Sequence, residues 1–386
     1  MSASQSFAPE MVIEALAARR DGAAALAARA PRAAVVGGFV RDTLLGSSPR
    51  EIDIVVEGDA AALAHEIGGT VTEHAAFGTA RVERDGWSID IAMARTETYS
   101  KPGALPQVAP ATLADDLRRR DFSVNAIAVT LAGAEMIADA RAADDLAARR
   151  LRVLHDAGFV DDPTRVMRLV RYAHRLGFEI DPHTRELADA AAFDSVSGAR
   201  IGAELRLILA EDDPIAPLRD LAGRLPVTVD RELIERALAL TPPDAQTDLV
   251  ILATVTRERA PQEWIADLEL TASERDVVVG AKQAPSLARA IERCATPSEL
   301  REALRGVPPE VVAIAGALGP AQAAARWLST LRHVALDIGG DDLLAAGVPA
   351  GVEIGARLDR TLRRKLDGEL TGGRDVELAS ALGEEA

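Results

Sequence analysis

The stretch VVGGFVRDTLLG at residues 35–46, together with EIDIVV at residues 51–56, constrains the fold more than any other part of this sequence. The apolar run at residues 33–36 ends in two glycines, which predicts a buried strand followed by a turn. Residues 39–46 then predict a short helix that ends at the next glycine. The alternating pattern of EIDIVV predicts a second strand. This part of the chain is therefore expected to hold a mixed sheet with helices.

The pattern of apolar residues changes at about residue 140. Before it, alternating apolar residues and tight turns predict further strands, and Asp59 has the position of a helix N-cap. The predicted strands are residues 70–74, 79–86, 87–94 and 122–131, and the predicted helix is residues 59–69. After it, apolar residues recur at helical spacing, first within residues 161–178. The sequence thus predicts the α+β class, with a mixed-sheet head and an all-helical body.

Charge and cysteine content narrow the possible functions. The net charge of −16 by itself disfavours a nucleic-acid partner, but residues 117–206 contain fourteen arginines and fourteen acidic residues and are neutral. The single cysteine, Cys294, excludes an intramolecular disulfide framework and a cysteine-based zinc site. No apolar run is long enough to span a membrane, and residues 1–20 lack a signal-peptide pattern. We therefore expect a cytoplasmic protein without a membrane partner.

Three acidic residues are candidates for metal binding. Glu51 and Asp53 are separated by one residue in a predicted strand, so their side chains are expected on the same face. Two neighbouring carboxylates repel unless a cation lies between them, and Mg²⁺ prefers such oxygen ligands. Asp90 offers a third acid on another predicted strand, so the three could hold the two metal ions used in phosphoryl transfer. The alternative is that Glu51 and Asp53 are solvated on an exposed strand face.

Gly37 and Gly38 lie between a predicted strand and a predicted helix, where free backbone N–H groups can bind an anion. Arg41 comes one helical turn later and is expected to reach the same phosphate. The alternative is an ordinary strand-to-helix turn, because the spacing matches neither a P-loop nor a dinucleotide-binding fingerprint. Together, the glycines, the arginine and the acids predict a site for phosphate and metal.

Several motifs follow one another in the order found in one enzyme family. They are GGFVRD at residues 37–42 with LLG and the acid-x-Asp strand after it, ARTETYSKPGALPQVAPATLADDLRRRDFSVNAIAV at residues 94–129, DDPTRVMRLVRYAHRLGF at residues 161–178, and IGGDDLLAAGVPAGVEIGARLDRTL at residues 338–362. In series they resemble the class II CCA-adding tRNA nucleotidyltransferases and bacterial poly(A) polymerases, whose head belongs to the DNA-polymerase-β superfamily. The resemblance is strong over residues 33–206, patchy up to residue 337, and returns after it.

The resemblance implies template-independent transfer of CMP and AMP from CTP and ATP to the 3′ end of tRNA, with release of pyrophosphate. Asp53, Asp90 and Glu51 are then the catalytic ligands of two Mg²⁺ ions. The residues implied in nucleotide binding are Gly37, Gly38, Arg41, Asp42, Arg120, Asp121, Asn125, Asp162, Arg165, Arg168 and Arg171. The resemblance also implies a catalytic head over residues 1–140, a nucleotide-reading helical neck over residues 141–210, and a tRNA-binding helical body and tail over residues 211–386.

Asp162 and Arg165 fall on the positions that the family uses to read the base, and their spacing places both on one face of the predicted helix. Cytosine and adenine present an amine beside a ring acceptor, so the carboxylate accepts from the amine and the guanidinium donates to the ring nitrogen. Uracil and guanine present a carbonyl to the carboxylate, and each unpaired buried polar group costs ~1–3 kcal/mol. Without the resemblance, a helix-capping ion pair is the simpler interpretation. For Arg168 and Arg171, the simpler interpretation is that they lie on a solvated basic face of the predicted helix.

The sequence departs from the family pattern in three places. Glu51 stands where the family usually has aspartate, Asp161 where it has glutamate, and Ala199 where it has glutamate before an Arg-Ile pair. Two alternatives to the CCA-adding function stay open. One is a narrower enzyme, CC-adding, A-adding or a poly(A) polymerase, and the segment RTETYSKPGALP at residues 95–106 favours A-adding capacity. The other is a relative that has lost catalysis and only binds RNA.

Overall fold

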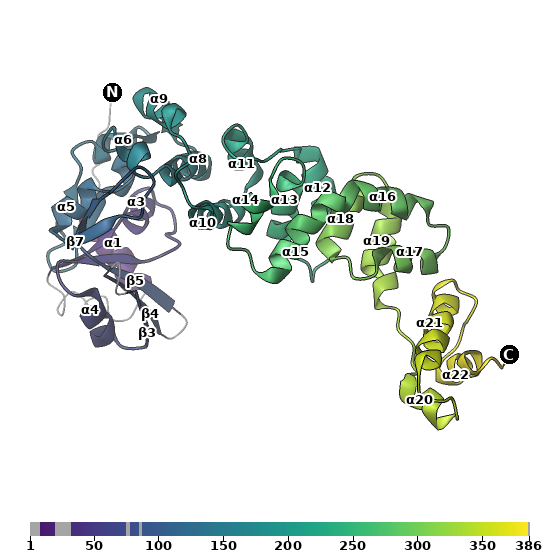
Figure 1. The fold of residues 1–386 in the computed structure, drawn as a ribbon. Coiled ribbons are helices and arrows are strands. Elements are labelled where there is room, and N and C mark those ends of the chain that lie inside the picture. Colours follow the sequence, from purple (N-terminus) through teal and green to yellow (C-terminus); the bar gives the residue numbers. More distant parts are fainter. Residues whose placement is uncertain (1–7, 20–31, 75–77, 85–86, 385–386) are drawn as a thin grey trace. The chain divides into compact units, whose positions relative to one another are not determined.

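The computed structural model describes residues 8–19, 32–74, 78–84 and 87–384. The chain divides into two compact units, Met1–Glu204 and Leu205–Ala386. The first unit, the head unit, combines sheets with helices, whereas the described part of the second unit is helical (Figure 1). The α+β class predicted from the sequence, with a mixed-sheet head followed by helices, is confirmed.

The head unit is built around a seven-stranded sheet with the strand order β3-β4-β5-β2-β1-β8-β9. β2 and β5 pair in parallel, and the other neighbours pair antiparallel. The strands are β1 Ala33–Val36, β2 Asp53–Val56, β3 Thr70–His74, β4 Thr79–Arg84, β5 Trp87–Met93, β8 Ile127–Thr130 and β9 Met136–Ala138. The five strands predicted before residue 95 are confirmed, although residues 85–86 of one of them lie outside the described part.

Two predicted strands are shorter in the structure than in the sequence pattern. β2 begins at Asp53, so Glu51 precedes the strand. In the predicted strand 122–131, a 3-10 turn, η2 (Ser123–Asn125), comes before β8. The turn is closed by the backbone N–H groups of Asn125 and Ala126, which donate to the carbonyls of Phe122 and Ser123 at 2.9 and 3.0 Å. The Ser123 hydroxyl also donates to Asp145 at 2.7 Å.

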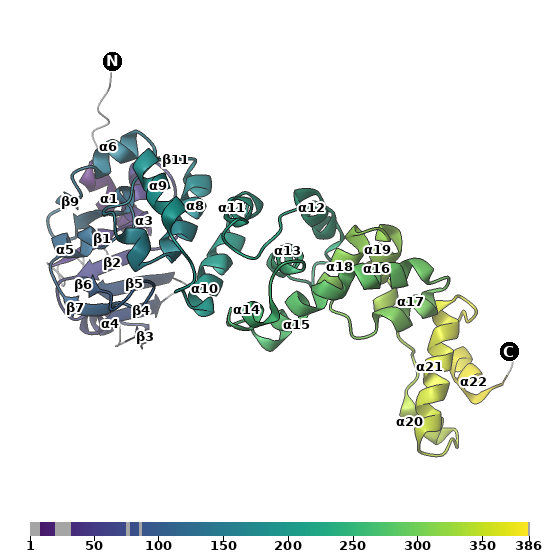
Figure 2. The ribbon, with the colours of Figure 1, turned by 45° about the horizontal axis from the view of Figure 1, so that its top comes forward.

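Helices and two small sheets complete the head unit (Figure 2). α4 begins at the predicted N-cap, since the Asp59 carboxylate accepts from the backbone N–H groups of Ala61 and Ala62 at 2.9 and 3.2 Å. The helices are α1 Pro9–Arg19, α3 Gly38–Leu44, α4 Ala60–Ile67, α5 Leu113–Arg118, α6 Ala142–Ala147, α7 Gly158–Asp161, α8 Thr164–Leu176 and α9 Pro182–Ala190, with α10 Gly198–Leu209 beginning in this unit and ending in the second. The small sheets pair β6 Arg95–Thr98 with β7 Gln107–Pro110, and β10 Arg150–Leu151 with β11 Glu179–Ile180.

Both faces of the central strands are buried in the head unit. In β1, Ala33 and Val35 pack into one apolar cluster, and Ala34 and Val36 pack into another that includes side chains of α5. This two-sided burial explains why β1 appears in the sequence as a continuous apolar run. It also holds the end of β1 in place, and the glycine turn follows directly.

The second unit consists of short helices around an apolar centre. α18 is buried over nearly its whole length and packs against α12, α13, α16 and α19. The helices are α11 Ile215–Leu221, α12 Arg231–Leu240, α13 Thr247–Thr256, α14 Gln262–Ala266, α15 Ala272–Gly280, α16 Ala284–Arg293, α17 Pro297–Leu304, α18 Pro309–Ala317, α19 Ala321–Ser329, α20 Gly340–Ala345, α21 Val352–Leu366 and α22 Arg374–Leu382, with 3-10 turns at η3 Ala281–Gln283 and η4 Leu331–His333. None of the described helices in either unit is long and apolar enough to cross a membrane.

Candidate active site

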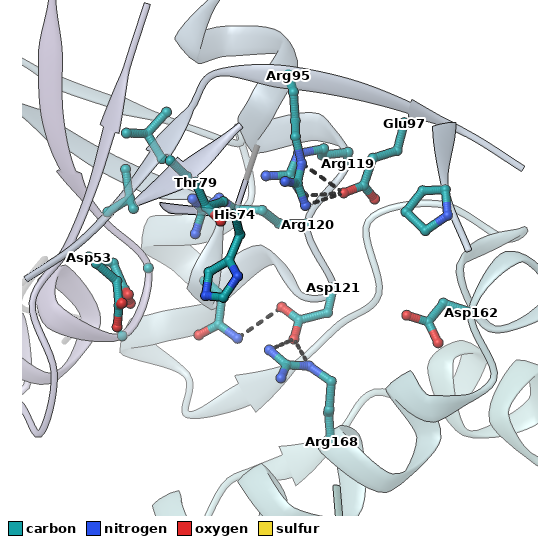
Figure 3. A pocket seen from close by; sticks show the side chains of 18 of the residues that line it. Asp53, His74, Thr79, Arg95, Glu97, Arg119, Arg120, Asp121, Asp162 and Arg168 are labelled. Carbon is teal, nitrogen blue, oxygen red and sulfur yellow. Dashed lines mark hydrogen bonds and ion pairs between the residues drawn. The ribbon is translucent and has the colours of Figure 1, made fainter. Parts of the chain in front are cut away.

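A cavity of about 1070 Å³ lies within the head unit, and most of the predicted site residues line it. Figure 3 shows Asp53 on one side of this cavity and Asp162 on the other, with Arg120 and Asp121 between them. The predicted residues on its wall are Gly37, Gly38, Asp53, Asp90, Arg120, Asp121, Asn125, Asp162, Arg165 and Arg168. Stretches of sequence that are far apart therefore meet around one space.

Asp53 and Asp90 lie side by side on the floor of this cavity. They are directly opposed in the parallel pair of β2 and β5, so both side chains leave the same face of the sheet. The Asp90 carboxylate accepts two hydrogen bonds from Arg81 on β4, from Nε to Oδ1 at 2.8 Å and from Nη2 to Oδ2 at 2.7 Å. Glu51 was predicted on the same strand face as Asp53. In the structure the strand starts at Asp53, so Glu51 lies in the exposed segment before it, from which its charge still acts on Asp53 and Arg81.

The charge of Asp53 is unfavourable in the protein alone. The pKa of its carboxyl is raised from 3.8 to about 6, chiefly by burial and also by the charges of Glu51 and Asp90, against the opposing effect of Arg120 and Arg168. A divalent cation beside Asp53 would remove this penalty, and the oxygen donors of Asp53 and Asp90 are of the kind that Mg²⁺ prefers. Among the described residues, no group of three His, Cys, Asp or Glu side chains is arranged to hold a metal ion. Asp53 and Asp90 are neighbouring carboxylates on this wall, so they could serve as two metal ligands.

Arg120 approaches the backbone of the glycine turn. Gly37 has a φ of +62°, and a Cβ added there would lie 2.8 Å from Arg120 Nη1. Only glycine combines this backbone conformation with so close a guanidinium. Arg120 is also bound to Asp116 of α5, with Nη2 to Oδ2 at 3.1 Å. The turn and Arg120 therefore form a cationic wall next to Asp53, where an anionic group could bind.

Arg41 and Asp42 do not line the cavity, contrary to the sequence prediction. Arg41 is 1% exposed, and its guanidinium donates to Asp42 Oδ1 at 2.7 Å and to Asn125 Oδ1 at 2.6 Å. Asp42 also accepts from Arg175 of α8 at 3.2 Å. Because both charges are buried, they need these partners beneath the turn, and they stabilise its position instead of facing a ligand.

Asp121 and Asn125 continue this buried network towards α8. The Asn125 amide donates to Asp121 Oδ1 at 2.9 Å, and Arg168 Nε donates to Asp121 Oδ2 at 2.8 Å (Figure 3). Burial acts to raise the pKa of Asp121, but Arg168, the Asn125 hydrogen bond and Arg165 outweigh it and lower the pKa to about 2. Asp121 is therefore an anion that positions the arginines of α8.

Tyr172 of α8 lies among three arginine side chains. The guanidinium carbons of Arg41, Arg168 and Arg171 lie 5.1, 5.4 and 4.7 Å from the centre of its ring. Such cation–π contacts, with the ion pair from Arg171 to Glu204 at 3.8 Å, hold this part of α8. The interpretation of Arg168 and Arg171 as a solvated basic face is wrong, because Arg168 is part-buried and Arg171 is 5% exposed.

Asp162 and Arg165 both face the cavity, but they do not share a helical face. α8 begins at Thr164, and Asp162 lies before it in an extended conformation. The Asp162 carboxylate accepts from the Thr164 backbone N–H at 3.0 Å and from Arg200 Nη2 at 2.5 Å. Arg165, in the first turn, donates to the backbone carbonyls of Arg119 and Arg120 at 2.8 and 3.2 Å. The predicted pair is thus brought together by a helix start and not by helical spacing.

The sequence analysis missed several cavity residues. Arg81 alternates with buried residues of β4, but its contact with Asp90 depends on the pairing of β4 with β5. Arg200 received no role, although it binds Asp162 and also donates to the Gly103 carbonyl at 3.1 Å. Glu97 of β6 accepts from both Arg95 and Arg119 at 3.0 and 2.8 Å. A local signal existed for Arg200 alone, since it is the arginine of the Ala-Arg-Ile triplet that was compared with the family.

Comparisons with known proteins agree with this geometry. Residues 33–152 match the family model described as the poly(A) polymerase head domain. An A-adding tRNA nucleotidyltransferase of Geobacter sulfurreducens is 35% identical in an alignment of 398 positions that covers 90% of this chain and 44% of that protein. The chain therefore spans less than half the length of this relative. A CCA-adding enzyme of Limosilactobacillus fermentum is 26% identical in an alignment of 404 positions that covers 96% of this chain and 98% of that protein.

A solved structure is also similar over nearly the whole chain. The CCA-adding enzyme of Thermotoga maritima, complexed with tRNA, gives a TM-score of 0.71 at 26% sequence identity. The match covers 97% of this chain and 98% of that one. The similarity therefore includes the helical part as well as the head.

Proposed function

Since residues 33–152 belong to the poly(A) polymerase head-domain family, we propose that this protein is a CCA-adding tRNA nucleotidyltransferase. It transfers CMP and AMP from CTP and ATP to the 3′ end of tRNA without a template. The 3′-hydroxyl oxygen forms a bond to the α-phosphorus, the bond to the bridging oxygen breaks, and pyrophosphate leaves. The observation that carries the proposal is the paired carboxylates of Asp53 and Asp90 in the same cavity as Asp162 and Arg165.

In this proposal Asp53 and Asp90 are the ligands of Mg²⁺, and Glu51 adds negative charge nearby. When bound, Mg²⁺ would lower the pKa of the attacking hydroxyl and neutralise charge on the leaving pyrophosphate. Asp53 and Asp90 orient the reacting groups, because the β2–β5 register fixes their separation. Arg120 and the turn at Gly37 and Gly38 bind the triphosphate, whose charge complements the guanidinium.

Base choice is proposed to reside in Asp162 and Arg165. The carboxylate accepts from the exocyclic amine of cytosine or adenine, and the guanidinium donates to the ring nitrogen beside it. Arg165 uses two of its five N–H groups on the carbonyls of Arg119 and Arg120, so its plane is fixed before a nucleotide binds. A fixed donor discriminates better than a mobile one because less conformational entropy is lost on binding.

The other parts of the proposal concern the rest of the chain. We assign base reading to the neck at residues 141–210 and tRNA binding to the helices of residues 211–386, through shape and backbone contacts. The segment from Arg95 to Leu113 holds β6 and β7 and joins the cavity to α5, so it is placed to change as the site passes from C to A. A cytoplasmic location follows from tRNA as the substrate.

The test is nucleotide incorporation by the full chain with Mg²⁺. Three tRNA transcripts, ending before CCA, after C and after CC, are offered each labelled nucleotide separately and then CTP with ATP. The expected result on the shortest transcript is two C and one A, followed by a stop. A long A tail or addition of C alone would contradict the CCA-adding function, and no incorporation by a folded protein would favour the RNA-binding alternative.

A second candidate is A-adding activity alone. It is favoured by the 35% identity to the A-adding enzyme of Geobacter sulfurreducens over 90% of this chain. The same assay separates the two, because an A-adding enzyme extends only the transcript that ends in CC, and by one A. The CCA-adding function requires that the two shorter transcripts accept C.

A further inference from the structure

Four polar residues form a row across the sheet at the base of the cavity. The pairing registers place Thr72 of β3 opposite Arg81 of β4, Arg81 opposite Asp90 of β5, and Asp90 opposite Asp53 of β2. Directly opposed residues project from the same face of a sheet, and all four line the cavity. Arg81 therefore lies on the far side of Asp90 from Asp53.

Arg81 occupies both oxygens of Asp90. The two hydrogen bonds, at 2.8 and 2.7 Å, form the planar fork that guanidinium and carboxylate prefer. A divalent cation between Asp53 and Asp90 would need an oxygen of the same carboxylate, and it would be repelled by the guanidinium at short range. Each oxygen keeps a second lone pair, but the charge of Arg81 disfavours a metal ion at Asp90 as long as the guanidinium stays in this position.

The ion pair is also placed so that it can open. The side chains of Arg81 and Asp90 are 48% and 38% exposed, and exposed ion pairs contribute little free energy. A bound divalent cation interacts with Asp90 more strongly than one exposed guanidinium does, so it can displace Arg81. The displaced guanidinium stays in the cavity because β4 holds its backbone against β5.

The positions of the cations indicate what Arg81 binds after release. Arg120 and the glycine turn lie beyond β2 on the β1 side of the acids, whereas Arg81 lies on the β4 side. In an in-line displacement the attacking and leaving groups are on opposite sides of the phosphorus. With the triphosphate at Arg120, the side of Arg81 receives the attacking RNA strand, whose phosphodiester is a suitable partner for a guanidinium.

We propose that Arg81 is a positioning residue that changes partners: it holds Asp90 in the metal-free enzyme, releases it when a divalent cation binds, and then holds a phosphodiester near the RNA 3′ end. This inference deepens the proposed function and rests on it. The proposal explains why Arg81 lies in a row with Thr72, Asp90 and Asp53. A metal site by itself would not require an arginine at this position.

The test compares Arg81→Gln with wild type in the full chain, and Arg84→Gln is the matched control. Arg84 is on the same strand, does not line the cavity, and donates to the Ile67 carbonyl at 3.1 Å. Binding of Mn²⁺ alone is followed by the electron paramagnetic resonance of the free ion. We expect the Kd for Mn²⁺ to fall roughly three- to fivefold in Arg81→Gln, since an exposed pair no longer has to open, and to stay within about twofold in the control.

Steady-state incorporation then reports the second role of Arg81. In Arg81→Gln the KM for tRNA should rise while the KM for CTP stays the same, and Arg81→Lys should recover part of the tRNA effect. If the Kd for Mn²⁺ is unchanged or higher in Arg81→Gln, Arg81 and the metal ion do not compete for Asp90, and the proposed change of partners is wrong. If the KM for CTP changes and the KM for tRNA does not, Arg81 does not bind the RNA phosphodiester. If wild type incorporates no nucleotide, the proposed function fails, but the Mn²⁺ comparison still decides whether Arg81 and the metal compete.

Discussion

Replacing Asp53 with asparagine tests the electrostatics of the candidate site without any substrate. The substitution keeps the shape of the side chain and removes its charge. In the metal-free protein this charge is unfavourable, because burial raises the pKa of Asp53 from 3.8 to about 6. The variant is therefore expected to be more stable than wild type at neutral pH, although it should have lost its activity.

The size and sign of the effect follow from linkage. A pKa of about 6 in the folded protein against 3.8 in the unfolded chain corresponds to about 3 kcal/mol. Between these two values the folded protein binds more protons than the unfolded chain. The stability contributed by protonated Asp53 is therefore present below pH 3.8 and is lost as the pH rises through about 6. Asparagine does not ionise, so Asp53→Asn avoids this loss.

The measurement is the free energy of unfolding of the head unit in EDTA, by urea denaturation at several pH values. We expect Asp53→Asn to exceed wild type by up to about 3 kcal/mol at pH 8 and by nothing below about pH 3. Asp115→Asn is the control, since hydrogen bonds to Thr112 lower the pKa of Asp115 and its removal should not stabilise the protein. Equal stability of Asp53→Asn and wild type at pH 8, or a difference independent of pH, would refute the reasoning.

Three further substitutions test other parts of the site. Asp162→Asn should lower the preference for CTP over UTP, measured as a ratio of kcat/KM, by roughly 10- to 100-fold, because the carboxylate no longer repels the uracil carbonyl. Asn125→Ala should destabilise the head unit to urea by about 2–4 kcal/mol, since it removes a partner from buried Arg41 and Asp121. Gly37→Ala, strained at a φ of +62° and 2.8 Å from Arg120 Nη1, should raise the KM for CTP and lower the thermal midpoint.

Local patterns in the sequence predict the elements of the head well. The apolar run before Gly37, the N-cap at Asp59 and the alternation around Asp90 each depend on residues a few positions apart. The strand–glycine–helix order and the acids on two strands were therefore visible. What no local pattern contains is that β2 and β5 pair in parallel, with Asp53 opposite Asp90.

The wrong predictions have a common physical cause. Arg41 was expected at the phosphate because it lies one turn into α3, but its side chain turns inward to Asn125 and Asp42. Asp162 was expected within the helix, but α8 starts two residues later and the carboxylate is free to accept from Thr164 and Arg200. In both cases one partner of the charged side chain, Asn125 for Arg41 and Arg200 for Asp162, comes from a distant part of the chain, which no local pattern reveals.

The balance of charge in the cavity explains how an acidic protein can bind polyanions. The chain carries −16, yet seven arginines and seven carboxylates line this cavity. They are Arg81, Arg95, Arg119, Arg120, Arg165, Arg168 and Arg200, with Asp53, Glu83, Asp90, Glu97, Asp121, Asp162 and Glu204. A neutral wall does not repel RNA, but it also does not neutralise a triphosphate, since many of these arginines are already bound to carboxylates. Under the proposed function, the missing positive charge arrives with the nucleotide, and a divalent cation at the half-buried carboxylate of Asp53, beside Asp90, would stabilise the protein as well as the substrate.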